Sequence, residues 1–292
     1  MDFDPANRDV AAPRYELESG SEDEFQVADH GAESRSEEPF QLVTADGSEN
    51  DGKLEQGSQL VVLIGHAGAS LLSSLGGAGL EQHSSLRCGS EQHAAIASAR
   101  SSRGGRVTVA LVAPSPQLRS WRLHEMASTL IETVKPSSVV IVDSYSPQDQ
   151  LYRDAAYSEE EAGPEAAIRY IVTPSYVAQH AIDSSKMAPL RSPESASGLG
   201  AAFLSKAVIN NVPAILTLLE DVSFQSHIQL YGSEGASRLS PAVNETLSAL
   251  TGLGGGAIDA ASNTRSLLDF ATSRRVQPAA NLAVLGDGNM YI

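Results

Sequence analysis

The chain has 292 residues, a net charge of −16 and one cysteine, and these values exclude several classes of protein. A strongly acidic chain argues against binding to nucleic acid or to an anionic membrane surface, because both need clustered Lys and Arg. The single cysteine, Cys88, excludes an intramolecular disulfide and a zinc site built from cysteines. No apolar run reaches the ~20 residues that span a bilayer, so the expected compartments are the cytoplasm and the nucleus.

The acidic residues are concentrated in the first fifth of the chain. Residues 1–56 hold 16 Asp or Glu against 4 Lys or Arg, a net charge of −12. Such a segment buries too little apolar surface to offset the entropy lost on ordering. We therefore predict a disordered acidic tail over residues 1–56, an α/β domain over 57–285 and a flexible C-terminal tail over 286–292.

Short apolar runs predict strands, and apolar residues at helical spacing between them predict helices. Continuous rather than alternating apolarity indicates strands that are covered on both faces. The predicted strands cover residues 60–64, 107–112, 139–142, 168–172 and 214–219. The predicted helices lie between Pro116 and Pro136, over 199–209, over 241–251 and around 267–270. Alternation of the two element types predicts an α/β fold of three layers, with a largely parallel sheet between helices.

Three longer segments rich in Ser, Gly, Pro and charge are expected to be loops, namely residues 76–105, 147–164 and 183–198. His83 and His93 fall in the first of them. Their expected role is therefore that of solvated surface residues.

A ligand site is best sought at His66 and Asp143, which follow two of the predicted strands. Ligands of parallel α/β sheets bind at the carboxyl ends of strands, but the simpler interpretation is that both residues belong to turns or helix caps. No Gly-x-Ser-x-Gly or Walker motif occurs. Residues 252–257 match G-x-G-x-x-A, yet they follow a predicted helix, which makes Gly252 a helix C-cap. We predict no catalytic, cofactor or metal residue, and no enzyme activity.

The end of the chain carries an apolar tripeptide on a flexible leader. Residues 286–289, Gly-Asp-Gly-Asn, can reach roughly 13 Å, and Met290-Tyr291-Ile292 follows them. These apolar groups are costly to leave in water, so a receptor is expected. It would recognise the Met290 side chain, the ring and hydroxyl of Tyr291, and the Ile292 carboxylate.

The terminal tripeptide resembles the hydrophobic-Tyr-any (HbYX) motif with which proteins dock on the proteasome. Three segments of the body, Val62–Gly65 followed by Ser70–Leu72, Lys135–Ser144 and, most of all, Ser197–Lys206, resemble the proteasome assembly chaperone 1 family. The resemblance covers roughly residues 60–221 and the terminus. The acidic tail and the segment 76–105 have no counterpart in it.

This resemblance implies a heterodimer with a second proteasome assembly chaperone, seated on the α-ring of the 20S core to promote α-ring assembly. Met290, Tyr291 and the Ile292 carboxylate would insert between neighbouring proteasome α-subunits, where the carboxylate pairs with a lysine. The fold would resemble that of nucleoside phosphorylases without their chemistry. Ser197 would lie near the N-cap of the helix that follows it.

Two other functions are compatible with the sequence. Met290-x-Ile292 also fits a hydrophobic PDZ ligand, which would make the chain an adaptor. A PDZ groove tolerates changes at the penultimate residue, so replacement of Tyr291 separates the two readings. A nucleoside-phosphorylase-like enzyme is the third possibility, and it rests on fold analogy alone.

Overall fold

The computed structural model describes residues 38–44, 56–75, 80–102, 104–113, 118–145, 168–190, 195–220, 239–253 and 270. The strands are β1 (Phe40–Thr44), β2 (Gln59–Ile64), β3 (Glu81–Cys88), β4 (Glu91–Arg100), β5 (Arg106–Val112), β6 (Ser138–Tyr145), β7 (Ile168–Val172), β8 (Ala188–Pro189) and β9 (Ala214–Glu220). The helices are α2 (Gly65–Ser74), α3 (Ser120–Val134), α4 (Pro174–Gln179), α5 (Gly198–Ile209) and α7 (Pro241–Thr251).

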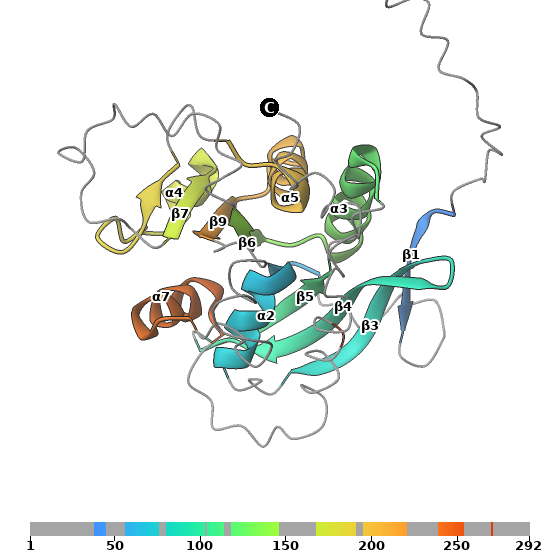
Figure 1. Ribbon diagram of the computed structural model, residues 1–292, viewed down its shortest axis with the longest axis horizontal. Helices are drawn as coiled ribbons and strands as arrows, with labels where there is room; N and C mark the ends of the chain where they lie inside the picture. Colours follow the sequence, from blue (N-terminus) through green and yellow to red (C-terminus); the bar gives the residue numbers. More distant parts are fainter. Residues whose placement is uncertain are drawn as a thin grey trace, which may run out of the picture. The chain divides into compact units, whose positions relative to one another are not determined.

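All described strands join one mixed sheet in the order β1-β3-β4-β5-β2-β6-β9-β7-β8 (Figure 1). The four central strands, β5, β2, β6 and β9, are parallel to one another. The β1-β3-β4-β5 side is antiparallel, and so is the pairing of β7 with β9. The α/β fold is therefore confirmed, but the expectation of a largely parallel sheet holds only for the centre.

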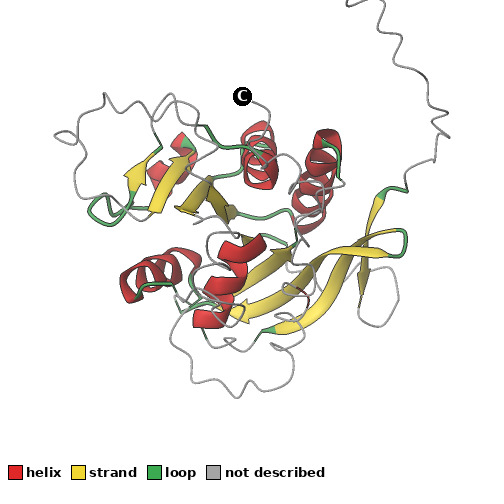
Figure 2. Ribbon diagram, viewed as in Figure 1, coloured by secondary structure: helices red, strands yellow, loops and turns green. Residues whose placement is uncertain are grey.

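Helices cover both faces of the sheet, as a three-layer fold requires (Figure 2). The central strands alternate between two apolar clusters, so that Val61 and Leu63 of β2 face one side while Leu60 and Val62 face the other. Helices α2 and α7 complete the first cluster, and α3 and α5 complete the second. Burial on both faces explains why these strands are continuously apolar. No helix of the described residues is long and apolar enough to span a bilayer.

The segment 76–105 was expected to be a loop, and this expectation is wrong for most of it. Strands β3 and β4 pair antiparallel there and extend the sheet beyond β5. Their sequences are rich in Ala, Ser and Gln, which strands normally avoid or expose. The small side chains of β4 nevertheless pack on both faces: Ala94 and Ile96 join one apolar cluster, Ala95 and Ala97 the other.

Strand β1 lies inside the segment 1–56 that the sequence assigns to the acidic tail, so that assignment fails for residues 40–44. Phe40 is buried, and it pairs with Cys88 of β3. The short apolar sequence of β1 is stable only because β3 supplies backbone partners and α3 covers its side chains. Residues 1–37 and 45–55 lie outside the described residues.

Lys135 ends α3 in the left-handed region, with φ of 46°, and its N–H donates to the Ile131 carbonyl at 2.8 Å. Side chains with a Cβ are strained there, whereas glycine is not. We expect Lys135→Gly to raise the free energy of unfolding by about 0.5–1 kcal/mol, measured by urea denaturation. Asn211, with φ of 53°, is the matched control, because asparagine tolerates this conformation and Asn211→Gly should gain less. A lower stability of Lys135→Gly would contradict this reading.

Candidate functional site

Met290, Tyr291 and Ile292, the residues expected to dock on the proteasome, lie outside the described residues. So does their leader, Gly286 to Asn289. The short helix expected around 267–270 also falls there, apart from Phe270, which is helical. The described residues do include Asp143, at the end of a strand, and the exposed side chains of the helices.

Asp143 lies near the end of β6, and both of its carboxylate oxygens accept hydrogen bonds. Oδ1 accepts from the Ser144 N–H at 2.8 Å, and Oδ2 accepts from the Gly200 N–H at 3.0 Å. Gly200 is in the first turn of α5, where N–H groups have no partner inside the helix. A Cβ on Gly200 would lie 2.6 Å from Asp143 Oδ2, so only glycine allows this close approach.

The carboxylate of Asp143 occupies the place where α/β folds bind an anionic ligand, the N-terminus of a helix next to a strand end. Negative charge at this position is favourable because the first-turn N–H groups carry partial positive charge. The capping role that the sequence suggested as the simpler interpretation is therefore what Asp143 performs. His66 is in the first turn of α2, directly after β2, but its side chain is outside the described part.

Two histidines that were expected at the solvated surface lie on strands instead. His93 on β4 is 2% exposed, and its ring meets the Phe40 ring edge to face at 5.3 Å. His83 on β3 is partly buried, with Nε2 2.8 Å from the Ser98 hydroxyl. The expectation was wrong because the segment folds as a hairpin. Among the described residues, no three His, Cys, Asp or Glu side chains converge in a way that could hold a metal ion.

Arg122 is a buried charge that the sequence reading missed. Its side chain is 4% exposed, donates from Nη2 to Cys88 Sγ at 2.7 Å and from Nη1 to Glu125 Oε2 at 2.6 Å, and lies over the Phe40 ring. It thereby fastens the β1–β3 edge to α3. Trp121, by contrast, is 51% exposed. The spacing of four residues between Arg122 and Met126, which are both buried, is the sequence signal that could have placed Arg122 on the inner face of α3.

The C-terminal end of α5 carries exposed apolar residues. Leu199, Ala202, Phe203 and Ala207 are buried against the sheet, and Leu204 is partly buried against the same apolar cluster. Val208 is 55% exposed and Ile209 71%. Large apolar side chains that are exposed next to each other are suited to contact another molecule, and Val208 and Ile209 form such a pair.

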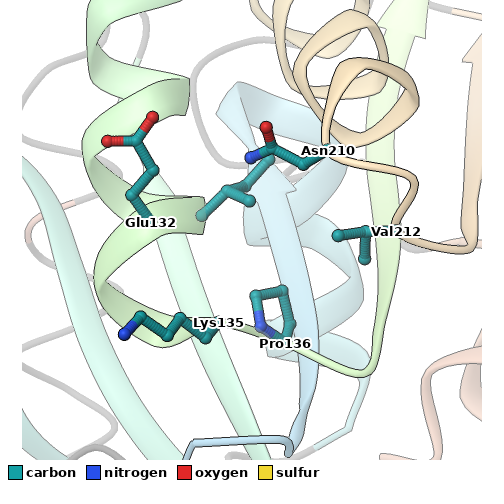
Figure 3. Close-up of a pocket in the computed structure, with 6 residues that line it drawn as sticks. Glu132, Lys135, Pro136, Asn210 and Val212 are labelled. Atoms are coloured by element: carbon teal, nitrogen blue, oxygen red, sulfur yellow. The ribbon is translucent and has the colours of Figure 1, made fainter.

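A hollow of about 330 Å³ adjoins these residues, between the ends of α3 and α5 (Figure 3). It is lined by Ile131, Glu132, Lys135, Pro136, Asn210 and Val212. Glu132 and Lys206 pair at 2.8 Å and join α3 to α5. The hydrogen bond and the charge of Lys206 hold the pKa of Glu132 below its usual value. We call Val208, Ile209 and this hollow the α3–α5 surface.

Four large apolar side chains are exposed in the described part of the chain. Val208 and Ile209 are neighbours at the C-terminal end of α5, whereas Trp121 is in the first turn of α3 and Val177 is on α4. Val208 and Ile209 are therefore the pair that lies beside the hollow.

No protein-family model and no curated protein matches this chain. Solved structures of several proteins resemble it at low identity, among them the three that follow. PbaB from Pyrococcus furiosus, described as an archaeal proteasome activator, has 12% identity and a TM-score of 0.48, over 85% of this chain and 98% of its own. PbaA from the same organism, described as an archaeal homologue of proteasome-assembly chaperone, has 11% identity and a TM-score of 0.47, over 87% and 100%.

The third is a proteasome-assembly chaperone homologue from Mycobacterium tuberculosis, with 12% identity and a TM-score of 0.40, over 77% of this chain and 98% of its own. All three TM-scores are below 0.5. Similarity at this level carries no conclusion on function, so the function has to be argued from the residues of this chain.

Proposed function

We propose that this protein is a non-catalytic proteasome assembly chaperone of the cytoplasm and nucleus. It pairs with a second assembly chaperone and docks on the α-ring of the 20S core to promote its assembly. The observation that carries the proposal is the sequence Met290-Tyr291-Ile292 on a glycine-containing leader. Each of its parts has a counterpart in peptide recognition: an apolar side chain, an aromatic ring with a hydroxyl, and a terminal carboxylate.

Two features of the described residues support the proposal. The α3–α5 surface offers apolar side chains for a partner, as expected of one half of a heterodimer. The N-terminus of α5 beside the strand ends, a place where α/β enzymes can bind an anion, already holds the Asp143 carboxylate. The second feature favours a binding protein over the enzyme alternative.

The test is capture of proteasome α-subunits from cell extract by the tagged full-length chain, with quantification by mass spectrometry. Tyr291→Ala should reduce the captured α-subunits by at least about tenfold, because the ring and hydroxyl contribute a central buried contact. Two extra residues after Ile292 should reduce them equally, because they remove the carboxylate from its place. Asn289→Ala is the matched control and should capture as much as the intact chain.

Capture of the second chaperone should be unchanged in all these variants, because pairing uses the folded domain. The PDZ alternative predicts a different pattern, in which the extension abolishes binding and Tyr291→Ala has little effect. If the intact chain captures no α-subunit, the proposed function is wrong.

A further inference from the structure

The hollow between the ends of α3 and α5 combines apolar lining residues with a positive charge at its edge. Ile131 and Pro136, which line it, are buried, and Val212 is partly buried. Lys135 also lines the hollow, and its side chain is exposed. The Lys135 ammonium and the Glu132 carboxylate point in different directions (Figure 3). A hollow of this kind fits an apolar side chain that has an anionic group next to it.

Glu132, the acidic residue of the hollow, already has a counter-charge. Its Oε1 lies 2.8 Å from Lys206 Nζ, and this contact lowers the pKa of Glu132. Lys186, a second lysine of the described residues, lies 3.5 Å from Glu245. Within the part of the chain that the structure describes, no ion pair involves the third lysine, Lys135. One positive charge is therefore left over beside the hollow, in a chain whose net charge is −16.

Lys135 holds its side chain on a backbone conformation that favours glycine. Its φ of 46° and ψ of 59° are in the left-handed region, which is strained for a residue with a Cβ. The conformation is fixed, because its N–H donates to the Ile131 carbonyl, its own carbonyl accepts from the Gly57 N–H at 3.0 Å, and Pro136 follows it. Backbone strain that the surroundings hold in place is typical of functional positions. A contact outside the domain would explain why a lysine stands here.

We propose that the α3–α5 surface binds a segment of the second chaperone in which an apolar side chain enters the hollow and a neighbouring Asp or Glu pairs with Lys135. This partner is the one named under the proposed function, on which the proposal rests. Charge complementarity carries the choice, because the hollow leaves one cation over next to the exposed Val208 and Ile209. These two side chains would keep water away from the ion pair, which strengthens it.

The test compares capture of the second chaperone from cell extract by the tagged full-length chain and by Lys135→Gly. We expect Lys135→Gly to capture about three- to tenfold less of it at about 50 mM NaCl, and the difference to shrink at about 500 mM. Because glycine relieves the left-handed backbone, this variant should melt no lower than the intact chain, so its loss of binding does not come from unfolding. Lys186→Gln, at another exposed lysine, is the matched control and should change the capture less than about twofold.

A second variant tests whether the Lys135 ammonium touches a carboxylate. Lys135→Arg keeps the positive charge and should capture the second chaperone as the intact chain does. A water-soluble carbodiimide condenses a lysine amine with a carboxylate in contact with it. In the captured complex of the intact chain, it should join Lys135 through an amide to an Asp or Glu of the second chaperone, identified by mass spectrometry. Lys135→Arg should give no such product, because a guanidinium group is not coupled.

Capture of the proteasome α-subunits reports on the proposed function separately. Lys135→Gly should capture them like the intact chain, because its terminus is unchanged. If the intact chain captures the α-subunits and the second chaperone, but Lys135→Gly retains as much chaperone or no amide forms at Lys135, the proposal for this surface is overturned and the proposed function stands. If the intact chain captures neither, both are wrong.

Discussion

Replacement of Gly68 by alanine is expected to lower the free energy of unfolding by about 2–3 kcal/mol, even though alanine is the better helix former. A Cβ on Gly68 would lie 2.6 Å from the carbonyl carbon of Leu63 and 2.7 Å from its Cβ. Leu63 belongs to β2 at the centre of the sheet and is fully buried, so its backbone cannot yield. Helix α2 would have to move off the strand, which would open contacts in the apolar cluster around Leu71 and Leu72.

The sign of the effect tests this account. If helix propensity decided, Gly68→Ala would stabilise the domain by about 1 kcal/mol, and Ala69→Gly would cost about the same. We expect both to destabilise, Gly68→Ala more than Ala69→Gly, in urea unfolding followed by circular dichroism at 222 nm. A Gly68→Ala variant as stable as the intact chain would show that α2 does not pack this closely on β2.

This glycine also shows what the sequence could predict. Gly65 to Gly68 follow an apolar strand, and the strand was predicted because burial on both faces leaves a continuous apolar run such as Leu60–Ile64. The helix after it was not predicted, because its two glycines and its serines have low helix propensity. Gly68 is required by the close approach of α2 to β2, which is a tertiary contact. Strands β3 and β4 were missed for a similar reason, since their small and polar residues become strand only through pairing.

The candidate site was likewise predictable from the sequence only in part. Asp143 could be placed at a strand end from the local pattern, but its partner Gly200 is 57 residues away in the chain and no spacing rule connects them. The exposed apolar residues of α5 were not predicted as exposed. The sequence of this helix is apolar enough to be fully buried, and it does not show which side of the helix lacks a neighbour. Met290-Tyr291-Ile292, by contrast, is known from the sequence alone, and its role stays a prediction.

The second large effect concerns the proposed pairing with a second chaperone. We expect the double variant Val208→Asp with Ile209→Asp to weaken this pairing by at least tenfold, which corresponds to about 1.4 kcal/mol. Both side chains are more than half exposed in the isolated chain, so they contribute little to its fold. At a dry interface, however, each carboxylate would be buried without a partner charge, and that is among the costliest changes an interface can undergo.

Val177→Asp is the matched control, because Val177 is 52% exposed on α4, outside the α3–α5 surface. Each tagged variant is used to capture partners from extract, and the second chaperone is quantified against the intact chain. The double variant should lose it while its melting temperature stays unchanged, and Val177→Asp should retain it. Equal retention by both variants would move the pairing surface away from α5. Loss by both would mean that exposed apolar area in general, rather than the α3–α5 surface, holds the partner.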